Sequence, residues 1–122
     1  MKILNLHHVQ LAMPAGQEDK AREFYIHLLG FDEIPKPPDL AKRGGVWFQH
    51  QQVQIHLGIE KDFRPAQKAH PALIVDSLDE FITALQSADL EIDSAQPALS
   101  GFKRVHIFDP FGNRIELMEI IK

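Results

Sequence analysis

The chain contains no cysteine among its 122 residues. Disulfide bonds, thiolate nucleophiles and cysteine-based zinc or iron–sulfur sites are therefore excluded. Also missing is any apolar run near the roughly 18 residues that a membrane span needs. The N-terminal segment 1–8 interrupts its few apolar residues with Asn5 and two histidines, so it does not resemble a signal peptide. We therefore expect a cytoplasmic protein.

Runs of basic residues are absent as well. Thirteen Lys and Arg stand against 17 Asp and Glu, which gives a net charge of −4 at pH 7. Because nucleic acid binding concentrates positive charge on one surface, we expect small-molecule ligands as partners, with no nucleic acid and no membrane. A hydrophobic content of 44% and a charged content of 25% are typical of a folded globular protein. The length predicts one domain over residues 1–122.

Two stretches of the chain resemble each other, over about 1–60 and 68–122. The first opens with His8 in an alternating apolar segment and reaches His56 between two apolar residues. The second opens with His70 and reaches Glu116 in the same context. The spacing from His8 to His70 is 62 residues, and that from His56 to Glu116 is 60. An internal repeat of this kind predicts two equivalent modules related by an approximate two-fold axis.

Each half shows the same order of elements, strand, helix and three strands, and this βαβββ pattern predicts an α+β fold. The strands follow from alternation of apolar residues, and the helices from apolar residues at i, i+3, i+4 and i+7. Ser77, followed by Glu80, has the pattern of a helix N-cap. The first half is predicted to contain strand 3–13, helix 17–29, strand 31–35, loop 36–44 and strands 45–49 and 52–59. After a linker at 60–69, the second half has strand 70–75, a helix, strand 90–93, loop 95–101, strand 103–108, turn 109–112 and strand 113–120.

Four side chains of the types that bind metals occupy equivalent places in the two modules. Alternation puts His8, His56, His70 and Glu116 on the strand faces opposite the apolar residues that pack under the helices. If two curved sheets face each other, all four line one cavity. Imidazoles and a carboxylate suit Zn²⁺, Ni²⁺, Mn²⁺ or Fe²⁺, so we predict a divalent metal that acts as a Lewis acid. Three further histidines, His7, His27 and His50, are expected at the surface.

The chain also resembles a known family. His8-Val9-Gln10-Leu11, the segment Phe24–Phe31, His70-Pro71-Ala72-Leu73 and the segment Asp109–Leu117 are similar to motifs of the vicinal oxygen chelate superfamily. That superfamily includes glyoxalase I, extradiol dioxygenases, fosfomycin resistance thiol transferases and bleomycin-binding proteins. The resemblance covers nearly the whole chain and implies two βαβββ modules forming a curved mixed sheet around a metal and substrate cavity. It also implies a homodimer, with the metal shared between two chains as an open possibility.

Residue roles follow from the same resemblance. His8 and His70 match the first-strand ligands of the two repeats, and Glu116 matches the carboxylate of the last strand. His56 falls where glyoxalase I carries a further Glu ligand, so it is a candidate fourth ligand or base; the alternative is a polar residue that lines the cavity. We therefore take His8, His56, His70 and Glu116 as metal ligands, with Glu116 and His56 as catalytic candidates.

Four more residues are candidates for substrate binding. Gln10 lies two positions after the first histidine, where the thiol transferases carry a Thr. Arg104 and His106 share one strand face ahead of the Asp109 turn, either as substrate anchors or as part of a solvated sheet surface. Trp47 either lines the pocket or belongs to the core.

These observations lead to three functional hypotheses. The leading one is a glyoxalase-like metalloenzyme with lyase or isomerase chemistry on a small substrate that has adjacent oxygens. The first alternative is a non-catalytic drug or metabolite binding protein of the same fold, involved in resistance. The second is a small ring-cleaving dioxygenase, for which His8, His70 and Glu116 would suffice as iron ligands. A metal-free protein in which the four residues form a hydrogen-bonded cluster stays open as well.

Overall fold

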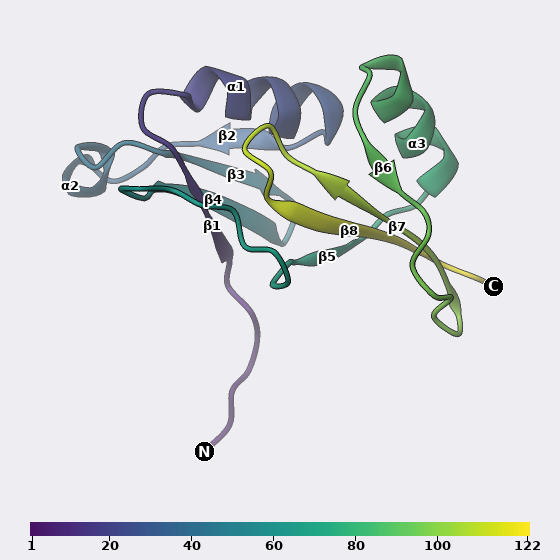
Figure 1. Cartoon of the computed structure of the whole chain (residues 1–122). Coiled ribbons are helices and arrows are strands. Elements are labelled where there is room, and N and C mark those ends of the chain that lie inside the picture. Colours follow the sequence, from purple (N-terminus) through teal and green to yellow (C-terminus); the bar gives the residue numbers. More distant parts are fainter. The chain divides into compact units, whose positions relative to one another are not determined.

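The computed structural model describes all residues from 1 to 122, in two compact units, Met1–Arg64 and Pro65–Lys122. Each unit contains one four-stranded mixed sheet and its helical segments (Figure 1). The strand order is β1-β4-β3-β2 in the N-terminal unit and β5-β8-β7-β6 in the C-terminal unit. In both sheets the first strand pairs in parallel with the last, and the other pairs are antiparallel. The predicted βαβββ repeat and fold class are confirmed.

The N-terminal unit places its elements close to their predicted positions. In chain order it consists of β1 (Val9–Met13), α1 (Glu18–Arg22), the π-helical segment η1 (Glu23–Leu28), β2 (Asp32–Ile34), α2 (Pro38–Ala41), β3 (Val46–His50) and β4 (Val53–Ile59).

Three details of this unit differ from the sequence-based prediction. Residues 3–8 are not part of the first strand; the ladder with β4 begins only at the pair Val9 and Ile55. The predicted single helix changes to π-helical hydrogen bonding, in which the Leu29 amide donates to the carbonyl of Phe24, five residues back. The predicted loop 36–44 contains the short helix α2, which begins at Pro38, a position where proline loses no hydrogen bond.

The C-terminal unit repeats the arrangement. Its elements are β5 (Ala72–Ile74), α3 (Leu78–Ser87), β6 (Ile92–Asp93), β7 (Phe102–Phe108) and β8 (Arg114–Ile120). The predicted cap of α3 is confirmed, since the Ser77 hydroxyl accepts a hydrogen bond from the Glu80 amide at 3.4 Å. Strand β5 is shorter than predicted, and His70 lies just before it. None of the helices is both long enough and apolar enough to cross a membrane.

Both units bury apolar side chains in their cores. Several polar side chains are buried as well. Tyr25 of η1 is fully buried and its ring stacks on Phe48 of β3 at a centroid distance of 5.1 Å. Leu85 of α3 is also fully buried. The buried polar and charged residues are His56, His106, Asp109, Asn113 and Glu116. Burying such groups costs free energy unless they find partners, so these residues are candidates for a functional site.

Candidate metal centre

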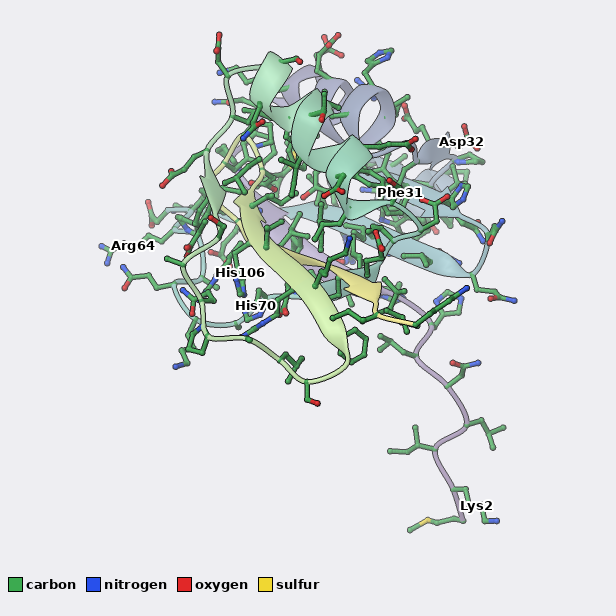
Figure 2. All side chains as sticks on the ribbon, turned by 90° about the vertical axis from the view of Figure 1, so that its right-hand side faces the viewer. Lys2, Phe31, Asp32, Arg64, His70 and His106 are labelled. Carbon is green, nitrogen blue, oxygen red and sulfur yellow. The ribbon has the colours of Figure 1, made fainter.

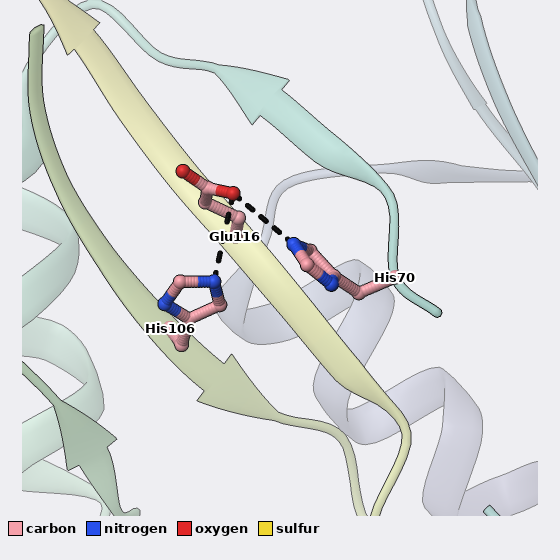
Figure 3. Close-up of side chains that lie close together, drawn as sticks. All are labelled: His70, His106 and Glu116. Carbon is pink, nitrogen blue, oxygen red and sulfur yellow. Dashed lines mark hydrogen bonds and ion pairs between the residues drawn. The ribbon is translucent and has the colours of Figure 1, made fainter. Parts of the chain in front are cut away.

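A cluster of three metal-type side chains lies in the C-terminal unit (Figure 3). His70 precedes β5, His106 belongs to β7 and Glu116 to β8, and one nitrogen or oxygen of each lies within 4.8 Å of the others. The β7–β8 hairpin pairs His106 directly with Glu116, and side chains of paired residues lie on the same sheet face. The Glu116 amide donates to the carbonyl of Pro71, which brings the preceding His70 alongside. The backbone ladder therefore assembles the cluster.

Both imidazoles approach the same carboxylate oxygen. Nε2 of His70 lies 3.1 Å from Oε1 of Glu116, and Nε2 of His106 lies 3.5 Å from that atom. The two histidine rings lie next to each other (Figure 2), and the distance between their centroids is 5.0 Å. Nδ1 of His70 lies 2.8 Å from the carbonyl oxygen of Lys68; because a carbonyl only accepts, this nitrogen carries a proton. That contact orients the ring and directs Nε2 toward the carboxylate, as an outer hydrogen bond does for a metal-binding histidine.

Charge around the cluster favours an ionised Glu116. Burial by itself raises the pKa of this carboxyl, but hydrogen bonds from Arg104 and His70 outweigh it and hold the pKa below its usual value. Nη1 of Arg104 donates to Oε2 of Glu116 at 3.0 Å. The pKa of His106 is lowered, first by burial and then by the positive charge of Arg114. His106 is therefore neutral near pH 7, the form that binds metals.

The donor set fits a divalent cation. Two imidazoles and one carboxylate are ligands that Zn²⁺ and similar ions accept. Ligands about 2.1 Å from a tetrahedral ion lie roughly 3.4 Å apart, close to the 3.1 and 3.5 Å that separate the histidine nitrogens from Oε1 of Glu116. Nδ1 of His106 is buried and has no hydrogen bond partner. Its Nε2, 3.5 Å from Oε1 of Glu116, is the nitrogen that faces the carboxylate.

A second group of predicted residues comes together in the N-terminal unit. The ring of His56 in β4 lies between two other rings, with centroids 4.0 Å from Trp47 and 4.0 Å from His8. The Lys36 ammonium lies 5.9 Å from the centre of the Trp47 ring. His56 is only 3% exposed. Its pKa is lowered to about 4, first by burial and then by the nearby charges of His8, His7 and Lys36. His56 is therefore neutral across the physiological range.

The orientation of His56 follows from one hydrogen bond. Its Nε2 lies 3.1 Å from the side-chain carbonyl oxygen of Gln54, which can only accept, so Nε2 carries the proton. Nδ1 is then the nitrogen with a free lone pair. Gln10 of β1 pairs in register with His56, but Gln10 is exposed to solvent. One face of Trp47 is covered by His56, so only its remaining surface is open to a ligand.

The structure thus brings the four predicted ligands together as two pairs. His70 and Glu116 meet in the C-terminal unit, and His8 and His56 stack in the N-terminal unit. Their convergence on a single ion stays a prediction. His106 was predicted either as a substrate anchor or as part of a solvated sheet surface, and sequence reasoning missed it as a candidate metal ligand. The signal was present, because a hairpin turning around Asp109–Gly112 places His106 opposite Glu116.

A sequence model described as the Glyoxalase/Bleomycin resistance protein/Dioxygenase superfamily matches residues 5–117. The chain belongs to this superfamily. The match includes His8, His56, His70, His106 and Glu116, all the candidate ligands of both units. No curated protein sequence matches the chain significantly.

Solved structures support the superfamily assignment. A Bacillus anthracis protein assigned to the glyoxalase family shares 45% sequence identity, with a TM-score of 0.93 over 99% of this chain and 98% of that one. The fosfomycin resistance protein FosX from Listeria monocytogenes has a TM-score of 0.78 at 17% identity, covering 98% and 96% of the two chains. TnmS3, an antibiotic binding protein from Streptomyces sp. CB03234, has a TM-score of 0.74 at 20% identity, covering 98% and 100%. The two distant likenesses establish the fold alone.

Proposed function

We propose that the protein is a glyoxalase-like metalloenzyme that binds one divalent ion and acts on a small substrate with two adjacent oxygens. The observation that carries this proposal is the cluster of His70, His106 and Glu116, whose ligand atoms lie within 4.8 Å of one another. Membership of the superfamily supports it. When bound, a divalent ion would polarise a substrate oxygen and stabilise the negative charge that develops in isomerase or lyase chemistry.

The chain's own residues divide the remaining tasks. His70 and His106 supply one imidazole nitrogen each, while Glu116 supplies the one carboxylate. His8 and His56 are proposed as further ligands or, for His56, as a base. A pKa of about 4 makes the His56 imidazole a weak base, so its neutral Nδ1 is better suited to binding a metal or accepting a substrate hydrogen bond. The homodimeric state and the cytoplasmic location stay predictions.

A second function is favoured by one specific observation. Both oxygens of Glu116 already have protein partners, since Oε1 lies near His70 and Oε2 accepts from Arg104. A cluster balanced in this way can persist without any ion, which suits a protein that sequesters a small molecule. FosX and TnmS3, which share the fold, are described as resistance and antibiotic binding proteins. The ring-cleaving dioxygenase stays a further alternative, since a Nostoc punctiforme protein described as a glyoxalase/dioxygenase also shares the fold.

Elemental analysis by mass spectrometry separates the two functions. The enzyme hypothesis predicts about one divalent ion per chain after purification or reconstitution, and its loss in Glu116→Gln. His27→Gln, which replaces an exposed histidine on η1 with side-chain exposure of 64%, is the matched control and should retain the ion. His8→Ala reports whether the N-terminal pair takes part. If neither the native protein nor the control holds metal after reconstitution, the metalloenzyme proposal is wrong.

A further inference from the structure

Arg104 holds the oxygen of Glu116 that faces away from the two histidines. Nη1 donates to Oε2 at 3.0 Å, while His70 and His106 both approach Oε1. Nη2 of Arg104 donates to the carbonyl oxygen of Pro97 at 2.6 Å, in the segment that joins β6 to β7. The guanidinium is therefore fixed at two points, and the carboxylate cannot turn without losing a charged hydrogen bond.

We propose that Arg104 is a positioning residue that limits Glu116 to one metal-binding oxygen and offsets its charge. The inference rests on the proposed metal function. A free carboxylate can bind a metal through one or both oxygens, and the choice changes the coordination number. With Oε2 engaged by Arg104, only Oε1 is left for the ion. The structure thereby assigns Arg104 a role different from the substrate anchoring that its sequence position suggested.

The burial of this ion pair makes it effective. The side chains of Arg104 and Glu116 are 20% and 7% exposed. A hydrogen bond between charged groups is stronger than a neutral one, and partial burial reduces its screening by solvent. Nε of Arg104 is buried without a hydrogen bond partner, which costs free energy. The side chain keeps this position despite that cost, held by its contacts to Glu116 and Pro97.

Charge balance gives the second consequence. The guanidinium cancels the single negative charge of the ligand set, so a bound divalent ion keeps its full charge for polarising a substrate. The same positive charge opposes binding of the ion. One unit charge a few ångströms from a divalent ion, in a partly solvated site, changes the dissociation constant by roughly tenfold. We therefore expect Arg104 to weaken metal binding and to increase the Lewis acidity of the bound ion toward a substrate oxygen.

Cobalt titration tests both consequences, because Co²⁺ replaces other divalent ions and its visible absorption weakens as its coordination number rises. Arg104→Leu removes the charge and frees Oε2, so Co²⁺ should bind roughly tenfold more tightly with a weaker absorption band. Arg104→Lys keeps the charge and one donor, and should restore the native affinity and spectrum. Lys103→Leu is the matched control, since Lys103 pairs with Glu119 at 3.3 Å on the same two strands. Arg104→Gln, also neutral, repeats the affinity measurement if the leucine variant does not fold.

The outcomes separate this inference from the proposed function. If the native protein binds about one Co²⁺ per chain, and the neutral Arg104 variants match it in affinity and spectrum, the inference is wrong and the metal site stands. A neutral variant that binds Co²⁺ more weakly also overturns it. If no form binds Co²⁺, the proposed metal function fails, and the role of Arg104 fails with it.

Discussion

Lowering the pH from 7 to 5 should destabilise the metal-free protein through His56. Its pKa is about 4 in the folded protein, whereas an unperturbed histidine, as in the unfolded chain, has a pKa of 6.5. Between these values the unfolded chain binds a proton that the folded protein excludes, so stability falls as the pH falls. The contribution is fully present above pH 6.5 and is lost progressively as the pH approaches 4.

The magnitude follows from the two pKa values. Each pH unit between them is worth about 1.4 kcal/mol. At pH 5 the folded His56 is mostly neutral while the unfolded one is almost wholly charged, so the loss relative to pH 7 is about 2 kcal/mol. Other groups with lowered pKa values, among them Glu116, also contribute at low pH. The comparison therefore needs a variant that removes the His56 contribution alone.

His56→Phe is that variant, because phenylalanine keeps a ring between Trp47 and His8 but cannot be protonated. Urea unfolding of both proteins at pH 7 and pH 5, with a chelator present, gives the two free energies at each pH. Trp47 is the chain's one tryptophan and stacks directly on His56, so its fluorescence reports the transition. The difference between native protein and variant should change by about 2 kcal/mol across this range. A change below about 0.5 kcal/mol would refute the conclusion that burial keeps His56 neutral.

Two further substitutions test the packing of the units. Leu85→Ala, at a fully buried position of α3, should lower the free energy of unfolding by about 3 kcal/mol in a urea titration, since it leaves a cavity; a loss below about 1 kcal/mol would contradict the close packing of α3. Gly45 and Gly30 both have positive φ, 83° and 82°, but an added Cβ would overlap the Leu57 carbonyl oxygen at Gly45 and meets no atom within 4 Å at Gly30. In thermal unfolding, Gly45→Ala should therefore lower the free energy of unfolding by at least about 3 kcal/mol, and Gly30→Ala by about 1 kcal/mol. Equal losses in the two variants would show that the overlap between the new Cβ and the Leu57 carbonyl oxygen is relieved.

Local regularities made most of the fold predictable. Alternation in β4 and β8 placed Ile55 and Leu57 on one face and His56 on the other, because side chains of a strand point to opposite faces in turn. Ser77 identified the start of α3 because its hydroxyl can satisfy a free amide of the first turn. The internal repeat then predicted the βαβββ order, because apolar residues in each half show the same succession of strand-type and helix-type spacings.

The ends of the strands depend on the neighbouring strands that pair with them, and alternation of apolar residues does not reveal those neighbours. The alternating pattern from residue 3 onward predicted a longer first strand. Residues 3–8 do not pair with β4, so the ladder begins at Val9. The π-helical η1 was equally hidden, since its apolar spacing suits an α-helix and only the hydrogen bonds distinguish the two.

The sequence by itself determined which residue types are available for metal chemistry, because composition excludes thiolates and alternation sets the face of each histidine and carboxylate. Tertiary structure decided which of them meet. His106 joins His70 and Glu116 because β7 and β8 pair in one particular register, and Arg104 reaches Glu116 because the same hairpin carries both. The lowered pKa values of His56 and His106 also arise from folding, since burial is set by what packs around each ring and not by the neighbours in sequence.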